Sequence, residues 1–121
     1  MTKCILVVED HDDNLQILRD LLGSAKYDML EARDGEQALI VAARHPPDLI
    51  LMDIQLPILD GYEVTRRLKS DTALKAIPII VVTSYALSGD EEKAYAAGCD
   101  AYVSKPYDPI ALLETIRQYL K

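Results

Sequence analysis

The chain has 121 residues, of which 50% are hydrophobic and 27% are charged, and it carries a net charge of −7. This length suits one domain, over 1–121, and the acidic charge argues against nucleic acid as a direct partner, because phosphate backbones attract clustered Lys and Arg. No apolar run approaches the roughly 20 residues of a membrane helix, and the start MTKCILVVED lacks the features of a signal peptide. We therefore expect a cytoplasmic protein that does not enter a membrane.

Five short apolar runs alternate with segments of helical periodicity. The runs predict strands over 4–8, 28–32, 49–52, 79–82 and 101–103. The first, third and fourth are continuously apolar, as strands covered on both faces are. The second is more polar, which suits an edge of the sheet.

The segments between these strands carry apolar residues at helical spacing. They predict helices over 13–25, 35–44, 61–69 and 89–97, with a last helix from 109 onward. Strands separated by helices indicate parallel pairing with right-handed crossovers. The predicted fold is therefore α/β, a doubly wound (βα)5 sandwich of the flavodoxin-like type.

Turn-forming residues mark the expected ends of the helices. Gly23 ends the apolar pattern of the first helix, and Gly98 is expected to be the C-cap of the fourth. The residues in N-cap position for the three later helices are Asp60, Ser88 and Asp108. The two cysteines, Cys4 and Cys99, form no metal or redox spacing and are interpreted as reduced thiols.

Polar residues follow the predicted strands, at the edge where open parallel sheets bind ligands. They are Glu9, Asp10, Asp53, Thr83, Ser84, Ser104 and Lys105. Two like charges about 4 Å apart repel by roughly 4 kcal/mol at an effective dielectric constant of 20, so crowded carboxylates require a counter-cation. Oxygen ligands with room for water describe a Mg²⁺ site better than a zinc site. His11 and His45 are not spaced to contribute, and we expect both at the surface.

Asp53 directly follows the apolar strand LILM, although Asp60-Gly61 already supplies the turn chemistry of this segment. A carboxylate can act as a nucleophile that forms an aspartyl-phosphate, and phosphoryl transfer requires chiefly positioning and charge neutralisation. We therefore predict that Asp53 attacks a phosphoryl group, while Mg²⁺, Lys105 and the Thr83 hydroxyl each hold one phosphoryl oxygen. In the alternative interpretation, these polar residues are ordinary turn and loop residues without a catalytic role. That interpretation requires four residue types suited to phosphoryl transfer to occur by chance at four separate strand ends.

The motifs VVEDHDDN, LILMDIQLPILDG, VVTS and AYVSKP together resemble the receiver domain of bacterial two-component response regulators, the CheY-like family, over essentially the whole chain. The segments MDIQLP, GDEE and GCDAYVSKP are most similar to the stand-alone regulators typified by DivK. The resemblance implies the strand order 2-1-3-4-5. It also implies a phosphoacceptor signalling protein with slow autodephosphorylation rather than a turnover enzyme.

The same resemblance implies roles for individual residues. Asp53 would accept the phosphoryl group of a phosphohistidine on a histidine kinase or a histidine phosphotransfer protein. The implied Mg²⁺ ligands are Asp10, Asp53, the backbone carbonyl of Gln55 and, through water, Glu9. Thr83 and Tyr102 would form the switch pair, in which Tyr102 fills the space that Thr83 vacates on phosphorylation. The Lys105-Pro106 peptide bond is expected to be cis.

Two surfaces are implied for protein partners. Kinase docking would use the helix over 13–25, along a stripe made by Asp13, Asn14, Ile17 and Leu21. In a competing interpretation, Ile17 and Leu21 simply widen the buried face of this helix. A downstream protein target would bind the surface formed by 89–97, 101–103 and the last helix, which includes Lys93, Tyr95 and Tyr102.

Two residues depart from the family pattern. Ser84 stands where Ala or Gly is commoner, and it would add a polar contact or crowd the entry of phosphate. Tyr85 places an aromatic ring beside the mouth of the site, where we predict that it hinders the hydrolytic water and prolongs the phosphorylated state.

Three other functions are weighed against this interpretation. A flavodoxin-type cofactor binder would need a phosphate loop after the first strand, where the sequence is EDHDDN. An aspartyl-phosphate hydrolase would place a second acid two residues after the nucleophile, where Gln55 stands. A receiver that docks independently of phosphorylation, or one excised from a larger hybrid kinase or regulator, also stays open.

Overall fold

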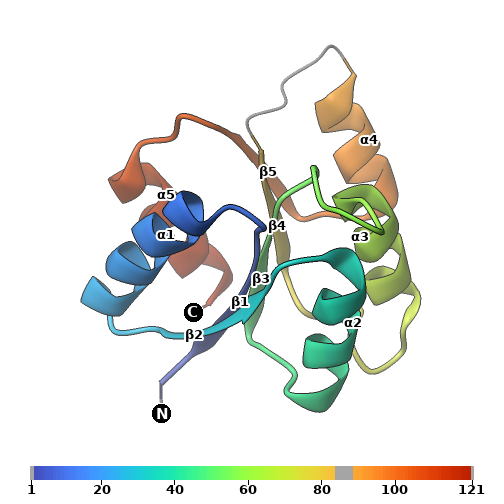
Figure 1. Ribbon diagram of the computed structural model, residues 1–121, viewed down its shortest axis with the longest axis horizontal. Helices are drawn as coiled ribbons and strands as arrows, with labels where there is room; N and C mark the ends of the chain where they lie inside the picture. The colour runs from blue at the N-terminus through green and yellow to red at the C-terminus, as the bar shows by residue number, and fades with distance from the viewer. Residues whose placement is uncertain (1, 84–88, 121) are drawn as a thin grey trace.

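The computed structural model describes residues 2–83 and 89–120, and its ten elements alternate regularly along the chain (Figure 1). The strands are β1 (Cys4–Val8), β2 (Asp28–Ala32), β3 (Leu49–Met52), β4 (Ile79–Thr83) and β5 (Ala101–Ser104). The helices are α1 (Asp12–Ser24), α2 (Gly35–Arg44), α3 (Gly61–Ser70), α4 (Asp90–Ala97) and α5 (Pro109–Tyr119). Every predicted element is present, with bounds within one residue of the prediction except at the end of α5, for which none was predicted.

All five strands are parallel, in the order β2-β1-β3-β4-β5, which confirms the predicted topology. The polar strand β2 lies at an edge, as predicted. Val8 pairs with Met52, and Met52 pairs with Val81, so the carboxyl ends of the central strands finish at nearly the same level. The residues that follow these strands are therefore brought to one edge of the sheet.

The sheet separates two hydrophobic cores, because successive side chains of a strand point to opposite faces. Ile5 and Val7 of β1 join the core beneath α1 and α5, whereas Leu6 and Val8 join the core beneath α2, α3 and α4. Figure 1 shows these two helix layers on either side of the sheet. The alternation of β1 explains how a continuously apolar strand serves both layers.

The helix ends follow local capping chemistry. Asp60 and Asp108 accept N-cap hydrogen bonds as predicted, from the backbone N–H of Glu63 and of Ile110, each 2.9 Å away. Gly23, where the apolar pattern ends, lies inside the last turn of α1, and the chain reverses at Lys26, whose φ is 66°. The predicted cap Ser88 falls outside the described residues, and Gly89, with φ 91°, is the N-cap of α4.

The two cysteines are free thiols, as predicted. Cys99 is buried, and burial raises the pKa of its thiol to about 11, which makes it unreactive at neutral pH. Within residues 2–83 and 89–120, no helix has the length and apolar character needed to cross a membrane.

Candidate functional site

The candidate site lies at the carboxyl edge of the sheet, and ladder hydrogen bonds fix the backbone of its residues. The backbone N–H of Asp53 donates to the carbonyl of Val8 at 3.0 Å, and that of Lys105 donates to the carbonyl of Thr83 at 2.8 Å. Each of these residues is therefore the first one beyond its strand and is still held by the neighbouring strand. This arrangement fixes the backbone positions from which their side chains extend.

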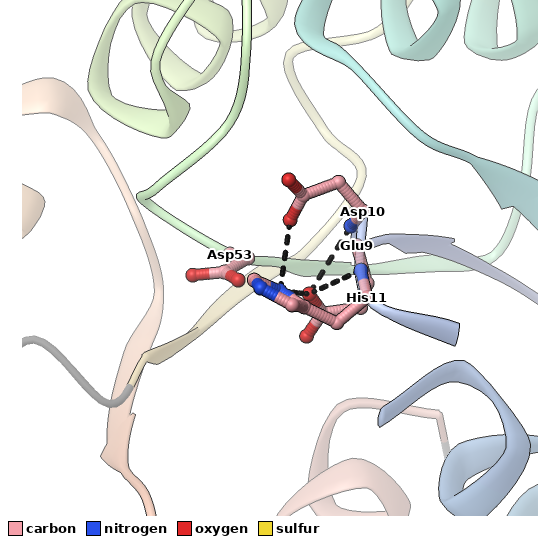
Figure 2. A group of neighbouring side chains, drawn as sticks. All are labelled: Glu9, Asp10, His11 and Asp53. Atoms are coloured by element: carbon pink, nitrogen blue, oxygen red, sulfur yellow. Dashed lines mark hydrogen bonds and ion pairs between the residues drawn. The ribbon is translucent and has the colours of Figure 1, made fainter. Parts of the chain in front are cut away.

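Glu9, Asp10, His11 and Asp53 form a single cluster, in which one potential ligand atom from each residue lies within 4.8 Å of the others (Figure 2). Glu9 and Asp53 are only 2% and 7% exposed. The Oδ1 atom of Asp10 is buried, and it makes no hydrogen bond with any residue that the structure describes. The structure thus brings together the three carboxylates that the strand ends predicted.

Lys105 is shared unequally between two of these acids. Its Nζ lies 2.8 Å from Oε1 of Glu9 and 3.9 Å from Oδ2 of Asp53. Burial raises the pKa of Glu9, but the hydrogen bond and charge of Lys105 outweigh that effect and leave the pKa below its usual value. Burial and the negative charge of Glu9 raise the pKa of Asp53 to about 6. Of these two acids, Asp53 is therefore the one whose charge Lys105 compensates less.

The prediction that neither histidine contributes to the acidic site is wrong for His11. It is exposed, as expected, but its Nδ1 lies 3.1 Å from Oδ1 of Asp10 and 3.3 Å from Oε2 of Glu9. The hydrogen bond with Glu9 and the charge of Asp10 raise the pKa of its imidazole. The strand ends at Val8, so strict alternation no longer applies and the loop folds His11 back over Glu9. His45, the C-cap of α2, is exposed as expected.

The loop after β3 holds Asp53 by backbone contacts that the sequence pattern did not reveal. The N–H of Gln55 donates to Oδ1 of Asp53 at 3.2 Å, and the N–H of Gly61 donates to the carbonyl of Ile54 at 2.9 Å. A Cβ on Gly61 would overlap the carbonyl oxygen of Asp53 and would lie 2.8 Å from Cα of Ile54. Gly61 therefore allows α3 to begin directly against the backbone of Asp53.

The proposed switch residues lie on the last two strands of the sheet. Thr83 is fully buried at the end of β4, beside Ser104 of β5. Tyr102 is half-buried, pairs with Val81 and packs against the core beneath α2, α3 and α4. Ser84 and Tyr85 lie outside the described residues. The Lys105-Pro106 peptide bond is cis.

The predicted docking stripe divides into two environments. Asn14 and Ile17 line an open groove of about 440 Å³, whose other wall is the segment Lys105–Tyr107 together with Pro109. Ile17 is 52% exposed and Asp13 is also exposed, whereas Leu21 is half-buried against the core beneath α1 and α5. On the predicted output surface, Lys93 and Tyr95 are exposed and Tyr102 is half-buried.

A doubly wound sheet with buried carboxylates and a lysine at its carboxyl edge is the architecture of a phosphoacceptor domain. The family model for the response regulator receiver domain matches residues 5–117. The chain belongs to this family, and it is a phosphoacceptor protein of two-component signalling. This membership favours the receiver interpretation over a flavodoxin-type cofactor binder or a phosphomonoester hydrolase.

Similar proteins include the polar-differentiation response regulator DivK of Brucella ovis, 48% identical over 99% of this chain and 98% of that protein. The receiver domain of a sensor histidine kinase from Pseudomonas aeruginosa has a TM-score of 0.92 and 36% identity, over 99% of this chain and 98% of that one. That domain has a magnesium ion coordinated in its active site cleft. A response regulator from Chloroflexus aurantiacus has a TM-score of 0.95 and 28% identity, over 99% and 98% of the two chains.

Proposed function

We propose that Asp53 accepts the phosphoryl group of a phosphohistidine on a histidine kinase or a histidine phosphotransfer protein. The observation that carries this proposal is the position of Asp53: a carboxylate 7% exposed at the end of a central strand, 3.9 Å from the ammonium of Lys105. Its two acidic neighbours, Glu9 and Asp10, lie in the same cluster and would contribute to a cation site. No other acid at the end of a central strand combines this burial with so little compensation of its charge among the described residues.

The donor set fits Mg²⁺, which prefers oxygen ligands and keeps several waters. The buried Oδ1 of Asp10 makes no hydrogen bond within the described residues, and Nδ1 of the exposed His11 lies 3.1 Å from it. A bound cation would compensate the charge of this buried oxygen. Asp10, Asp53 and the backbone carbonyl of Gln55 would hold the ion, and Glu9 would act through water. When bound, the ion supplies positive charge beside the transferred phosphoryl group.

In this reaction, a carboxylate oxygen of Asp53 attacks phosphorus while the phosphorus–nitrogen bond of the phosphohistidine breaks. The electron pair of that bond returns to the imidazole of the donor, which then takes up a proton. Lys105 stabilises one phosphoryl oxygen, and its short contact with Glu9 keeps the ammonium at the site in the absence of phosphate. The hydroxyl of Thr83 stabilises another oxygen and moves toward it, and Tyr102 turns into the space that Thr83 leaves.

Two faces of the domain then connect this reaction to partners. The histidine-bearing partner docks at the groove beside α1, where Asn14 and the exposed Ile17 face the loop after β5. The downstream protein binds the surface formed by α4, β5 and α5.

The domain works in the cytoplasm, spans 1–121, and hydrolyses its own aspartyl-phosphate slowly without turning over an external substrate. Tyr85 and Gln55 modulate that hydrolysis.

The test uses acetyl phosphate as donor, with the phosphorylated fraction measured by intact mass. The wild type is expected to gain one phosphoryl group with Mg²⁺ and none with chelator. Asp53→Asn should abolish the gain, while Asp71→Asn, at the exposed C-cap of α3, should leave it unchanged. An Asp53→Asn variant that is phosphorylated like the wild type would refute the proposal.

Binding of Mg²⁺ with beryllofluoride, a phosphoryl mimic, tests the switch. We expect chemical-shift changes at Thr83 and Tyr102 that Asp53→Asn abolishes. If these residues do not respond although the mimic binds, the domain acts as a dock that is independent of phosphorylation.

A further inference from the structure

We propose that His11 is a nitrogen donor to the cation site and shifts its preference from Mg²⁺ toward first-row transition ions such as Mn²⁺ and Co²⁺. The inference rests on the cation site of the proposed function. It concerns which ions occupy that site rather than whether an ion binds.

The position of the imidazole carries the inference. Figure 2 shows the ring of His11 between the carboxylates of Glu9 and Asp10, with its Nδ1 3.3 Å and 3.1 Å from their oxygens. One of these is Oδ1 of Asp10, the buried oxygen that has no hydrogen bond within the described residues. A ring nitrogen of His11 is therefore a close neighbour of a buried carboxylate oxygen that makes no hydrogen bond.

The spacing of the donors matches a shared ion. Two ligand atoms that each lie roughly 2.1 Å from one ion are at most about 4.2 Å apart. The four donor atoms of the cluster lie within 4.8 Å of one another, so a closure of a few tenths of an ångström brings them into range. His11 and Asp10 are not part of the buried core, so both can adjust their side chains during this closure.

The backbone directs the ring into the cluster. The N–H groups of Asp10 and His11 both donate to Oε2 of Glu9, at 3.1 Å and 3.2 Å, so the loop wraps around that carboxylate. Nδ1, the ring nitrogen nearer the backbone, consequently faces the acids. The same wrapping brings the side chain of Glu9 beneath the ring, where it also binds Lys105.

A nitrogen donor changes selectivity because Mg²⁺ prefers oxygen ligands, whereas imidazole suits transition ions. For a fixed donor set, affinity rises from Mn²⁺ to Co²⁺. The rival role is electrostatic: an imidazolium that pairs with Glu9 and Asp10 would compete with every divalent cation to the same extent. If the effect of replacing His11 differs from one metal ion to another, His11 is a metal ligand. If the effect is the same for all ions, His11 acts only as a positive charge.

The experiment titrates the metal-free full chain with Mg²⁺, Mn²⁺ or Co²⁺ by calorimetry, comparing the wild type with His11→Asn. We expect His11→Asn to change Mg²⁺ affinity less than about twofold and to weaken Co²⁺ binding at least roughly tenfold, with Mn²⁺ between them. His45→Asn, at the other exposed histidine, is the matched control and should change none of the three. Pulsed electron spin resonance of the Mn²⁺ complex should detect a coupled imidazole nitrogen in the wild type and not in His11→Asn.

An equal change for all three ions, or Mn²⁺ without nitrogen coupling, would overturn this inference and leave the proposed function intact. If the wild type binds none of the ions and takes up no phosphoryl group from acetyl phosphate, the proposed function itself fails.

Discussion

The hydroxyl of Tyr62 donates a hydrogen bond to Oδ1 of Asp90 at 3.1 Å and so joins α3 to the first turn of α4. Asp90 is 5% exposed, and its carboxylate contributes to raising the pKa of Tyr62 to about 12, after burial. Because the acceptor is a buried carboxylate, we expect Tyr62→Phe to lower the free energy of unfolding by about 1.5–3 kcal/mol. Urea denaturation measures this loss. Tyr27→Phe, which removes a hydroxyl from a half-buried tyrosine in the other core, is the control and should cost less.

The hydrogen bond between Tyr62 and Asp90 tethers α4 to α3, and hydrogen exchange can measure the local effect of this tether. With Tyr62→Phe, the amides of the first turn of α4 should exchange faster, while those of α1 should not change beyond the global loss of stability. Uniform acceleration over the whole domain would contradict a specific role for the tether at α4.

Gly61→Ala should disturb the loop that carries Asp53. The added Cβ would overlap the carbonyl oxygen of Asp53, so the start of α3 must move away from the strand. We expect a loss of about 1–3 kcal/mol in the free energy of unfolding, as in other overpacked sites. The rate of phosphorylation by acetyl phosphate should also fall in variant protein that remains folded.

Gly23→Ala provides the matched control for this substitution. Gly23 lies in α1, its φ is not positive, and a Cβ there meets nothing within 4 Å. Alanine in a helix is more stable than glycine by about 0.5–1 kcal/mol, so the thermal midpoint should rise. If Gly61→Ala and Gly23→Ala changed stability in the same direction, the close approach at Gly61 would have no energetic importance.

Ile58 and Ile110 are expected to respond oppositely to replacement by glycine. Both side chains are largely exposed, at 69% and 66%, so little packing is lost at either position. Ile58 has a φ of 73°, a conformation that strains a β-branched residue and that glycine adopts freely. We expect Ile58→Gly to stabilise the domain by about 0.5–1 kcal/mol and Ile110→Gly, in a helix, to destabilise it by a similar amount. Thermal denaturation distinguishes the signs, and a loss in both variants would show that Ile58 is unstrained.

The ion pair between Arg19 on α1 and Glu31 on β2 should make stability depend on pH. Arg19 donates to both carboxylate oxygens, one of them at 2.8 Å, and its hydrogen bond lowers the pKa of Glu31. A lowered pKa in the folded state stabilises the domain above the pKa of the unfolded chain and loses this effect as the pH falls through the folded value. The pair is partly exposed, so we expect Glu31→Gln to cost about 0.5 kcal/mol at pH 7.

The measurement is urea denaturation at a series of pH values. The difference between Glu31→Gln and the wild type should vanish in strong acid, where Glu31 is protonated in both states. Glu114→Gln, at an exposed position of α5, is the control and should show a smaller difference at every pH. A difference for Glu31→Gln that does not depend on pH would mean that shape rather than charge stabilises this contact.

Local chemistry explains why the sequence predicted most of the fold. Apolar runs and caps such as Asp60 act within a few residues, so they located the elements closely, but the strand order came from the family resemblance. Residues such as Asp53 and Lys105 were found because the ends of parallel strands share one edge. The pairing of Lys105 with Glu9 joins residues 96 positions apart and depends on distances that no local pattern contains.

His11 and Gly61 were missed as site residues for related reasons. The direction of His11 follows from a loop that wraps around Glu9, where the alternation of a strand no longer applies. The importance of Gly61 comes from contact with the backbone of Asp53, whereas the sequence marks it only as a turn residue. Both depend on the path of an irregular segment, which the periodicity of helices and strands does not specify.

Within the part of the chain that the structure describes, the two cores on opposite faces of the sheet have no buried side chain in common. Substitutions beneath α1 should therefore add their free energies to those beneath α3, because distant sites without shared partners are independent. Substitutions beneath α1 can accordingly accumulate without repacking the half of the molecule that contains α4. The sheet remains common to both halves, because successive side chains of β1 enter opposite cores.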